Sequence, residues 1–346
     1  MKRLLSLPCE CLSYIPHNST NVTNQLWSLM NRLPRHSLEA QLDEIQSRLN
    51  PRYVEGCVRA LDLRVRDLRR ALESIHDDQN ELYRYFPVAA LATLESYFKT
   101  AVAAIIDHSS EYLERGLALI AERSLKAHEA IGIIRSGTAT PGQLIAHLLP
   151  FSSLAHLENS IDKLLDASIK EQLRTALDAY DVRNEQNEPR VVVTDVPDLW
   201  RRLDQAFRHR HILAHEAAPD FRLTRNEVCE VIDAVDEFMH GANAVLWNSV
   251  WRATPLTMRE INDRAGKEMF QCRQRLSSLI RKLKRLGRLD IHRHRLWRTY
   301  FLGYMNGVGD EMMGSIRPRV YATTATSLLH HRIRELEPRF EEGALF

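Results

Sequence analysis

The sequence predicts an all-α protein in which an antiparallel helical bundle follows an N-terminal helical hairpin and precedes a small C-terminal helical domain. Leu, Ala, Arg and Glu dominate the chain, whereas runs rich in Val, Ile and Thr are scarce, so good helix formers fill most positions. Apolar residues also recur at three- and four-residue steps, the period of one buried helical face. The 346 residues exceed the roughly 250–300 at which a single core stops growing. We therefore expect three parts: residues 1–83, 84–252 and 253–346.

Residues 1–20 have the composition of an irregular leader rather than of a signal peptide. Their apolar run is about half of the 7–15 residues that the centre of a signal peptide needs, and Pro8 spoils a lipoprotein cleavage site before Cys9. The five cysteines are scattered, without the paired spacing of a zinc site or a disulfide framework. No run approaches the roughly 18 apolar residues of a membrane span. These features favour a cytoplasmic protein without a membrane partner.

A helical hairpin is expected between residues 37 and 83, because apolar stripes lie on both sides of Pro51, a residue that helix interiors exclude. Pro87 then precedes a helix with one strongly apolar face. That face consists of Leu91, Leu94, Phe98, Val102, Ile105 and Ile106. The spacing predicts a helix that is buried in the core.

The next helix is expected from about Tyr112 to Ile134, with the usual stop signal at Gly137 and Pro141 beyond it. Residues 143–182 are expected to supply one or two more helices. A polar stretch then leads into Val191–Asp195, where a short extended piece is expected.

Two capped helices follow. Asp195 and Pro197 are typical of a helix N-terminus, and the helix they start carries a histidine-rich run. Thr224 starts the second helix, and Glu227 three residues later completes a capping box. The tail contains several helix-weakening residues: Gly303, Gly307, Gly309, Gly314 and Pro318. A final helix is expected from about Tyr321 to Leu336.

The run Phe207–Glu216 places two arginines and three histidines at one helix end. It resembles the signature of HEPN (higher eukaryote and prokaryote nucleotide-binding) domains, in which an Arg, usually followed by Asn, Asp or His, precedes a His by four to six residues. The short form is matched by Arg210, His211 and His215, and the long form by Arg208, His209 and His215. An upstream helix containing Leu94–Phe98 and a downstream amphipathic helix complete the arrangement. The resemblance covers roughly residues 85–250 and implies a HEPN-like bundle.

The resemblance implies a metal-independent endoribonuclease that needs no cofactor and acts as a homodimer, with two such motifs sharing one cleft. The ribose 2′-hydroxyl attacks its own phosphate in such a reaction, which leaves 2′,3′-cyclic phosphate ends. His215 is the expected general acid or base, because an imidazole exchanges protons near neutral pH, and Arg210 is the expected phosphate clamp. The remaining expected site residues are the helpers Arg208, His209 and His211 and the orienting residue Glu95. RNA is the expected partner, together with an antitoxin or a regulatory protein, since such domains often serve toxin, antiviral (phage-defence) or stress-response systems.

The C-terminal part is similar to the small helical domain of LprI-type lysozyme inhibitors. The similarity rests on four runs: Arg295–Tyr300, Gly314–Pro318, Thr326–Leu329 and Arg332–Leu336. Secreted members usually carry a cysteine pair in this region, whereas this chain has no cysteine after Cys272. Since a domain can keep its fold while its site changes, lysozyme inhibition is not expected to carry over.

The C-terminal part is also basic. Between Arg259 and Arg298 thirteen Lys or Arg residues face four acids. An RNA-phosphate surface is expected at Arg281, Lys282, Lys284, Arg285 and Arg288, beside an apolar strip of Leu279, Ile280, Leu283 and Leu286. A solvated charge run, neutralised by acidic parts of residues 37–81, explains the same pattern equally well. No metal site is expected, because the histidines here lack Cys or carboxylate partners at ligand spacing.

Three functions therefore remain open. The first is a HEPN-type endoribonuclease, and the second is a non-catalytic HEPN-type module that binds RNA or protein, because a histidine beside Ile212 and Leu213 also suits a buried structural position. The third is an LprI-like lysozyme-binding protein. Phosphate-binding glycine loops, His-Glu-x-x-His zinc helices and nucleophile elbows are absent from the sequence, which argues against the enzymes that depend on them.

Overall fold

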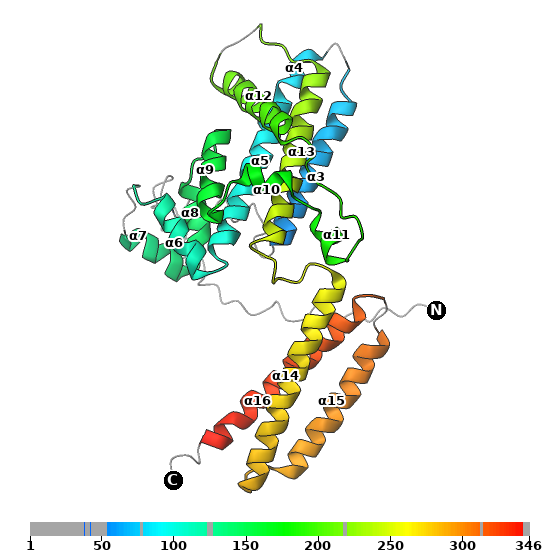
Figure 1. Ribbon diagram of the computed structural model, residues 1–346. Helices are drawn as coiled ribbons and strands as arrows, with labels where there is room; N and C mark the ends of the chain where they lie inside the picture. The colour runs from blue at the N-terminus through cyan, green and yellow to red at the C-terminus, as the bar shows by residue number, and fades with distance from the viewer. Residues whose placement is uncertain are drawn as a thin grey trace, which may run out of the picture. The chain divides into compact units, whose positions relative to one another are not determined.

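The computed structural model describes residues 38, 42, 54–76, 79–122, 127–216, 220–311 and 314–341 (Figure 1). In these residues every named element is an α-helix, and the bridge between Leu177 and Val191 is isolated and antiparallel. The predicted all-α class is confirmed. The bridge also confirms an extended piece near Val191.

The chain divides into two compact units. The first comprises Met1–Gln172 and Asp195–Met239, and the second comprises Leu173–Thr194 and His240–Phe346. The predicted domain limits at 83–84 and 252–253 stay predictions, because compactness does not test whether a part folds by itself.

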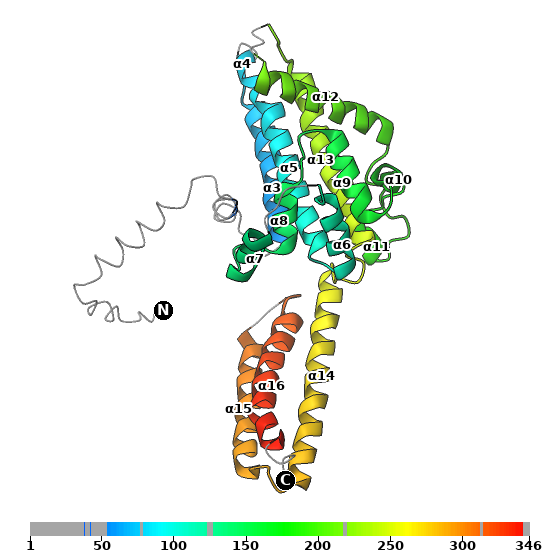
Figure 2. The same ribbon diagram turned by 90° about the vertical axis from the view of Figure 1, so that its left-hand side faces the viewer.

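The first unit is arranged around one central helix. The helices that lie wholly within it are α3 (Val54–Glu73), α4 (Asn80–Tyr83), α5 (Tyr85–Ile106), α6 (Ser110–Leu119), α7 (Ala127–Ser136), α8 (Pro141–Leu148), α9 (Leu154–Leu165) and α12 (Val196–His215). Two more, α10 (Ile169–Arg174) and α13 (Arg225–Asn248), begin in the first unit and end in the second. The central helix is α5, which packs against α3, α8 and α12, and Figures 1 and 2 show it running beside α3.

The core of the first unit confirms the predicted apolar face of α5. All six of its predicted residues are buried. Phe98 of this face and Trp200 of α12 both pack on Phe238 of α13, with ring centroids 5.1 Å apart in each pair. The stretch Glu81–Ile106 is long and apolar enough, by length and composition alone, to cross a membrane. Most of its most apolar window is buried inside the protein, and the core helix of a soluble protein passes the same test.

The prediction of a single helix from Tyr112 to Ile134 is wrong. The chain instead forms α6, which ends at Leu119, and α7, which begins at Ala127. At the C-cap Ile120 the backbone leaves helical geometry (φ −110°, ψ 8°), and its N–H donates to Leu117, so a tighter turn closes the helix. The predicted stop at Gly137 is confirmed by its φ of +75°.

Residues 143–182 also form more helices than the one or two expected. The segment contains the end of α8, then α9, α10 and α11 (Ala179–Arg183). Side-chain caps create these extra starts: Thr140 forms a capping box with Gln143, Ser153 accepts a hydrogen bond from the His156 N–H, and Asp178 caps α11. Polar capping residues therefore divide this segment into more helices than hydrophobic periodicity alone predicts.

The expected N-terminal hairpin lies only partly within the described residues. Its second arm is α3, whereas Pro51 and most of the first arm lie outside them. Leu42 of the first arm is buried with Ile133, Ala139 and Leu144.

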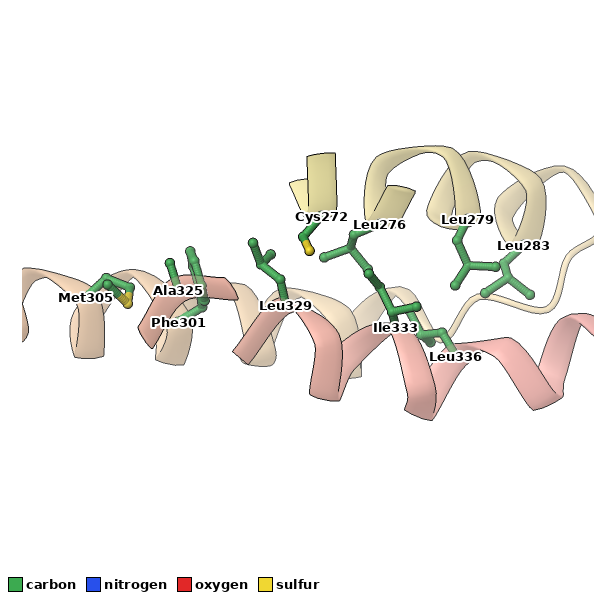
Figure 3. Close-up of a cluster of buried hydrophobic side chains, with 10 residues drawn as sticks. All are labelled: Cys272, Leu276, Leu279, Leu283, Phe301, Met305, Ala325, Leu329, Ile333 and Leu336. Atoms are coloured by element: carbon green, nitrogen blue, oxygen red, sulfur yellow. The ribbon is translucent and has the colours of Figure 1, made fainter. Parts of the chain in front are cut away.

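The second unit is built around three long helices, α14 (Met258–Arg285), α15 (Ile291–Glu311) and α16 (Arg317–Glu341). Both α14 and α15 pack against α16. Figure 3 shows their shared core, in which leucines of α14 point toward α16. The core consists of Cys272, Leu276, Leu279, Leu283, Phe301, Met305, Ala325, Leu329, Ile333 and Leu336. The expected final helix is confirmed and extends further at both ends. Leu286, expected in the apolar strip, is 53% exposed, because α14 ends before it.

A polar clasp holds the start of α14. Arg183 donates to the Glu260 carboxylate at 2.7 Å and to the backbone carbonyl of Arg252 at 2.6 Å. Glu260 also accepts from the backbone N–H groups of Leu256 and Thr257. Although its partial burial alone raises the pKa of Glu260, these donors and Arg183 lower it to about 2. The carboxylate is therefore charged at neutral pH and closes the capping box with Thr257.

Candidate functional site

The histidine-rich run lies in the last turns of α12, and both ends of this helix are set by the sequence. Asp195 caps the start by accepting from the Asp198 N–H at 2.9 Å, and a proline occupies the first turn, as predicted. The helix ends at His215, where Glu216 turns extended. Buried Leu199, Leu203 and Ala206 fix which side of α12 faces the core. Because the helix is continuous, the residues of its final two turns keep the same orientation relative to the core.

Arg210 lies on the inward side of α12 and meets Glu95 of α5. Its Nη1 is 3.0 Å from Glu95 Oε1, and the two side chains are only 25% and 20% exposed. Among the residues that the structure describes, none makes a well-aligned hydrogen bond to Oε1, so the contact is an ion pair. Burial raises the pKa of Glu95, while the positive charges of Arg210 and Lys99 oppose that rise. The fold thus brings together two of the predicted site residues, which are 115 positions apart in the chain.

His211 and His215 form a pair on the outer side of α12. Their ring centroids are 5.2 Å apart with an interplanar angle of 53°, and both residues are exposed. A separation of four positions places them one turn apart on a single face. Two imidazoles at this distance can take opposite roles, one accepting a proton and the other donating one.

Arg208 lies one turn before this pair and is also exposed. Its guanidinium donates to the Asp204 carboxylate, which lies one turn further back on α12. The side chain is 74% exposed, so the ion pair is open to exchange with a phosphate. The exposed face of α12 therefore carries Arg208, His211 and His215 in sequence along its end.

His209 lies apart from the exposed pair. It is 9% exposed and packs edge-on against Phe221, with ring centroids 5.4 Å apart. Burial lowers its pKa, although the Glu227 carboxylate opposes this, and its Nδ1 has no hydrogen-bond partner within the described part of the chain. This environment favours a structural role over the predicted helper role.

Two further ionisable residues near this pair were not predicted: Lys99, whose positive charge acts on Glu95, and His147, whose neighbour is Lys99. Lys99 lies one turn beyond Glu95 on α5, and His147 lies on α8, which packs against α5. Burial lowers the pKa of His147, and the positive charge of Lys99 lowers it further. The spacing of Glu95 and Lys99 on one helix face could have signalled Lys99. No sequence signal could have placed His147 here, since it comes from a separate helix.

The predicted RNA-phosphate residues are all exposed. Arg281, Lys282, Lys284 and Arg285 occupy the last turns of α14, and Arg288 follows in the connection to α15. Leu279 and Leu283 point from the same helix into the core, as Figure 3 shows. The helix therefore packs one face and presents the basic side chains on the others.

The comparisons with known proteins return no relative. No family model, curated protein or solved structure matches the chain.

Proposed function

We propose that this protein is a metal-independent endoribonuclease of HEPN type, acting as a toxin, antiviral or stress-response effector. The observation that carries the proposal is the exposed His211–His215 pair at the end of α12, with Arg208 beside it. Acid–base chemistry at an RNA phosphate requires one proton acceptor and one proton donor near the same phosphorus. An exposed pair of imidazoles supplies both without a metal or a cofactor.

The proposed reaction is an internal transfer. One imidazole removes the proton of the ribose 2′-hydroxyl, the 2′-oxygen attacks the adjacent phosphorus, and the bond from phosphorus to the 5′-oxygen breaks. The other imidazole protonates that 5′-oxygen, so the products are a 2′,3′-cyclic phosphate and a 5′-hydroxyl. An arginine stabilises the charge that develops on the phosphate. Arg208 is the nearer candidate on the exposed face, whereas Arg210 requires release from Glu95.

A homodimer is part of the proposal. The end of α12 is exposed, and a second copy would enclose the scissile phosphate between two such ends. Enclosure excludes water and strengthens the electrostatic contacts on the phosphate. An antitoxin or other regulatory protein that covers this end would keep RNA from the site and so prevent cleavage.

A non-catalytic module that binds RNA or protein is the second candidate. It is favoured by one observation, the occupation of Arg210 by Glu95 in a half-buried ion pair. An arginine held in this way stabilises the packing of α12 on α5 and contacts no phosphate. The two candidates differ in whether the exposed imidazoles are needed for turnover.

The test is cleavage of total cellular RNA by the purified protein in EDTA, with wild type compared with His215→Ala and Arg210→Ala at equal folded concentration. We expect wild type to leave 2′,3′-cyclic phosphate ends. His215→Ala should lose about 10²–10⁴-fold in rate, the usual contribution of a general acid or base. Arg210→Ala should also lose activity if Arg210 reaches the phosphate in the active dimer.

Matched controls are His331→Ala on α16 and Arg201→Ala on α12, both at exposed positions. They should cleave like wild type. If a dimeric wild type cleaves none of a varied set of RNAs, or if His215→Ala cleaves at the wild-type rate, the ribonuclease proposal is wrong and the binding module is favoured.

A further inference from the structure

One thiol of the second unit lies directly against an imidazole. Cys272 of α14 and His330 of α16 come from two helices that pack closely on each other, and the Cys272 Sγ is 3.2 Å from the His330 Nε2. Cys272 is a free thiol. Neither residue belongs to the histidine-rich run on α12, so this pair needs an explanation of its own.

The two partners differ in their surroundings. Cys272 is 8% exposed and lies in the apolar core with Leu276 and Leu329, and Figure 3 shows its sulfur on the side of α14 that faces α16. His330, by contrast, is exposed. A buried cysteine that only fills space behaves as a small apolar group and needs no base beside it. The imidazole offers this shielded sulfur a proton acceptor that is itself in contact with solvent.

A thiol beside an imidazole is a nucleophile with its general base in place. The thiolate, rather than the thiol, attacks electrophiles, and a free thiol is only a few per cent thiolate at neutral pH. In the tautomer that carries its proton on Nδ1, His330 presents Nε2 as an acceptor. The separation of 3.2 Å is within the reach of about 2.6–3.2 Å that proton transfer requires. His330 can therefore take the proton of Cys272 during an attack by the sulfur.

A metal site is the other common use of a cysteine and a histidine. Zinc sites in proteins typically use three or four side-chain ligands. Among the residues that the structure describes, no third His, Cys, Asp or Glu joins Cys272 and His330 within ligand distance. Two donors alone do not complete such a site, so the arrangement favours chemistry on the sulfur itself.

We infer that Cys272 is a modification site, a thiol that His330 activates toward small hydroperoxides. The thiol proton passes to His330 Nε2, and the sulfur attacks one oxygen of hydrogen peroxide. A sulfur–oxygen bond forms while the oxygen–oxygen bond breaks, and the departing hydroxide takes the proton from the imidazolium and leaves as water. The sulfur is oxidised by two electrons to a sulfenic acid, and the peroxide is reduced.

The burial of the sulfur selects the size of the reagent. A side chain that is only 8% exposed admits a molecule of two heavy atoms more readily than a bulky disulfide or alkylating agent. The new oxygen also enters the core between α14 and α16, where it replaces an apolar contact by a polar one. This modification goes beyond the proposed ribonuclease activity and does not depend on it.

The experiment exposes the full-length wild-type chain to hydrogen peroxide at neutral pH, with a metal chelator to suppress metal-catalysed oxidation. At set times catalase removes the peroxide, the chain is unfolded, and iodoacetamide alkylates the thiols that remain. Mass spectrometry of tryptic peptides then counts the Cys272 and Cys229 thiols separately. Alkylation reports the thiol alone, so oxidation of Met269, which shares the Cys272 peptide, does not disturb the count.

Cys229 is the internal reference, because it is a free thiol that is more exposed than Cys272. Cys272 should nevertheless lose its thiol at least about tenfold faster than Cys229. His330→Ala should slow the loss at Cys272 at least about tenfold, since a general base typically contributes about 10²–10⁴-fold and restricted access offsets part of that. If His330 only shields the sulfur, its removal should instead speed the oxidation.

Two further variants separate the base from a mere polar contact. His330→Gln keeps a polar side chain but accepts no proton at neutral pH, so it should be as slow as His330→Ala. The matched control His331→Ala removes the adjacent exposed histidine of α16 and should react like wild type. Circular dichroism checks that each variant keeps its helical content.

Three results would overturn the inference. The first is a Cys272 thiol that reacts no faster than Cys229 in the wild type. The second is a His330→Ala chain that is oxidised at Cys272 as fast as wild type or faster. The third is a wild-type rate in His330→Gln, which would mean that a polar neighbour suffices and that no proton is transferred to His330.

Discussion

Two segments of this chain have almost the same side-chain chemistry and opposite environments. Residues 208–211 read Arg-His-Arg-His on α12, and residues 292–295 read His-Arg-His-Arg on α15. On α12 the exposed pair His211 and His215 stands free of the core. On α15, His294 is packed flat on Trp297, with ring centroids 5.9 Å apart and planes at 16°. The comparison teaches that packing partners, not local composition, decide which histidines can meet a substrate.

The pKa directions agree with this contrast. Burial lowers the pKa of His294, and the nearby positive charges of Arg332 and Arg298 lower it further. The buried guanidinium of Arg332 lies over the Trp297 ring at 5.6 Å and pairs with Glu335 at 2.5 Å. His294 is therefore kept neutral as part of an aromatic and cationic stack.

The largest effect should separate the two histidines. We expect His211→Ala to lower RNA cleavage by about 10²–10⁴-fold, since it removes one member of the proposed acid–base pair. His294→Ala should stay within about twofold of wild type in rate. Initial rates on one labelled RNA give both values, and a His294→Ala loss as large as that of His211→Ala would break the comparison.

A substitution in the aromatic stack on α15 should change the stability of the protein rather than its activity. Trp297→Ala should lower the free energy of unfolding by about 3 kcal/mol, the lower end for a Trp truncation, because Trp297 is only partly buried. The adjacent Leu296→Ala, at a 59% exposed position, should change it by less than about 0.5 kcal/mol. Urea denaturation measures both, and equal losses would mean that the exposed side chain of Leu296 also helps to hold the bundle.

The ion pair behind α12 should have a smaller effect on activity. Glu95→Gln keeps the shape of the side chain but removes the charge that holds Arg210. Arg210 is then freer to reach the phosphate, so turnover should rise by about tenfold, or about 1.4 kcal/mol. The matched control Glu81→Gln removes an exposed carboxylate paired with Arg84. Single-turnover cleavage measures both variants. An unchanged rate for Glu95→Gln would show that Arg210 acts only in packing.

The smallest effect should appear in the pH dependence of stability. The pKa of His209 is below its ordinary value of 6.5 in the folded chain. The unfolded chain therefore binds more protons as the pH falls through 6.5, so His209 should cost stability below that pH and none well above it. Thermal melts between pH 7.5 and 5.5 should show a falling Tm. The fall should be smaller in His209→Phe, and an identical fall in both would exclude His209 as a source.

Periodicity and capping chemistry were enough to predict much of the fold. They identified α5 from its apolar face, α12 from Asp195 and Pro197, and α13 from the Thr224–Glu227 capping box, in which each residue accepts the other's backbone N–H. They failed between α6 and α7, where a turn at Ile120 interrupts a continuous apolar pattern. Caps and turns of this kind depend on local hydrogen bonds that a hydrophobic period does not record.

In the glycine-containing tail the error has the opposite sign: the sequence indicates a weak helix where the structure has a continuous one. Gly303 and Gly307 weaken a helix by roughly 1 kcal/mol each, yet α15 runs through both. Phe301 and Met305 explain this, since their burial in the bundle core favours the helix despite its glycines. Tertiary packing overrides propensity here, and a single sequence does not reveal the packing partner.

The candidate site was predictable in its residue types but not in their arrangement. The pair of His211 and His215 follows from their spacing on a helix. Glu95 was expected to orient the motif from the HEPN resemblance alone, whereas its pairing with Arg210 was not predicted, because no spacing links positions so far apart. The burial of His209 depends on Phe221 from the loop after α12, and that contact has no signal in the sequence.

The clasp at the start of α14 gives the chain a particular resistance to proteases. Trypsin cleaves after Arg252 only if it can draw the carbonyl of that residue into its oxyanion hole, and Arg183 already donates to this oxygen. Digestion at this bond therefore requires the clasp to open first. The cutting rate at Arg252 thus reports how often the connection between α13 and α14 opens, and Arg183→Ala should make this bond one of the first to be cut.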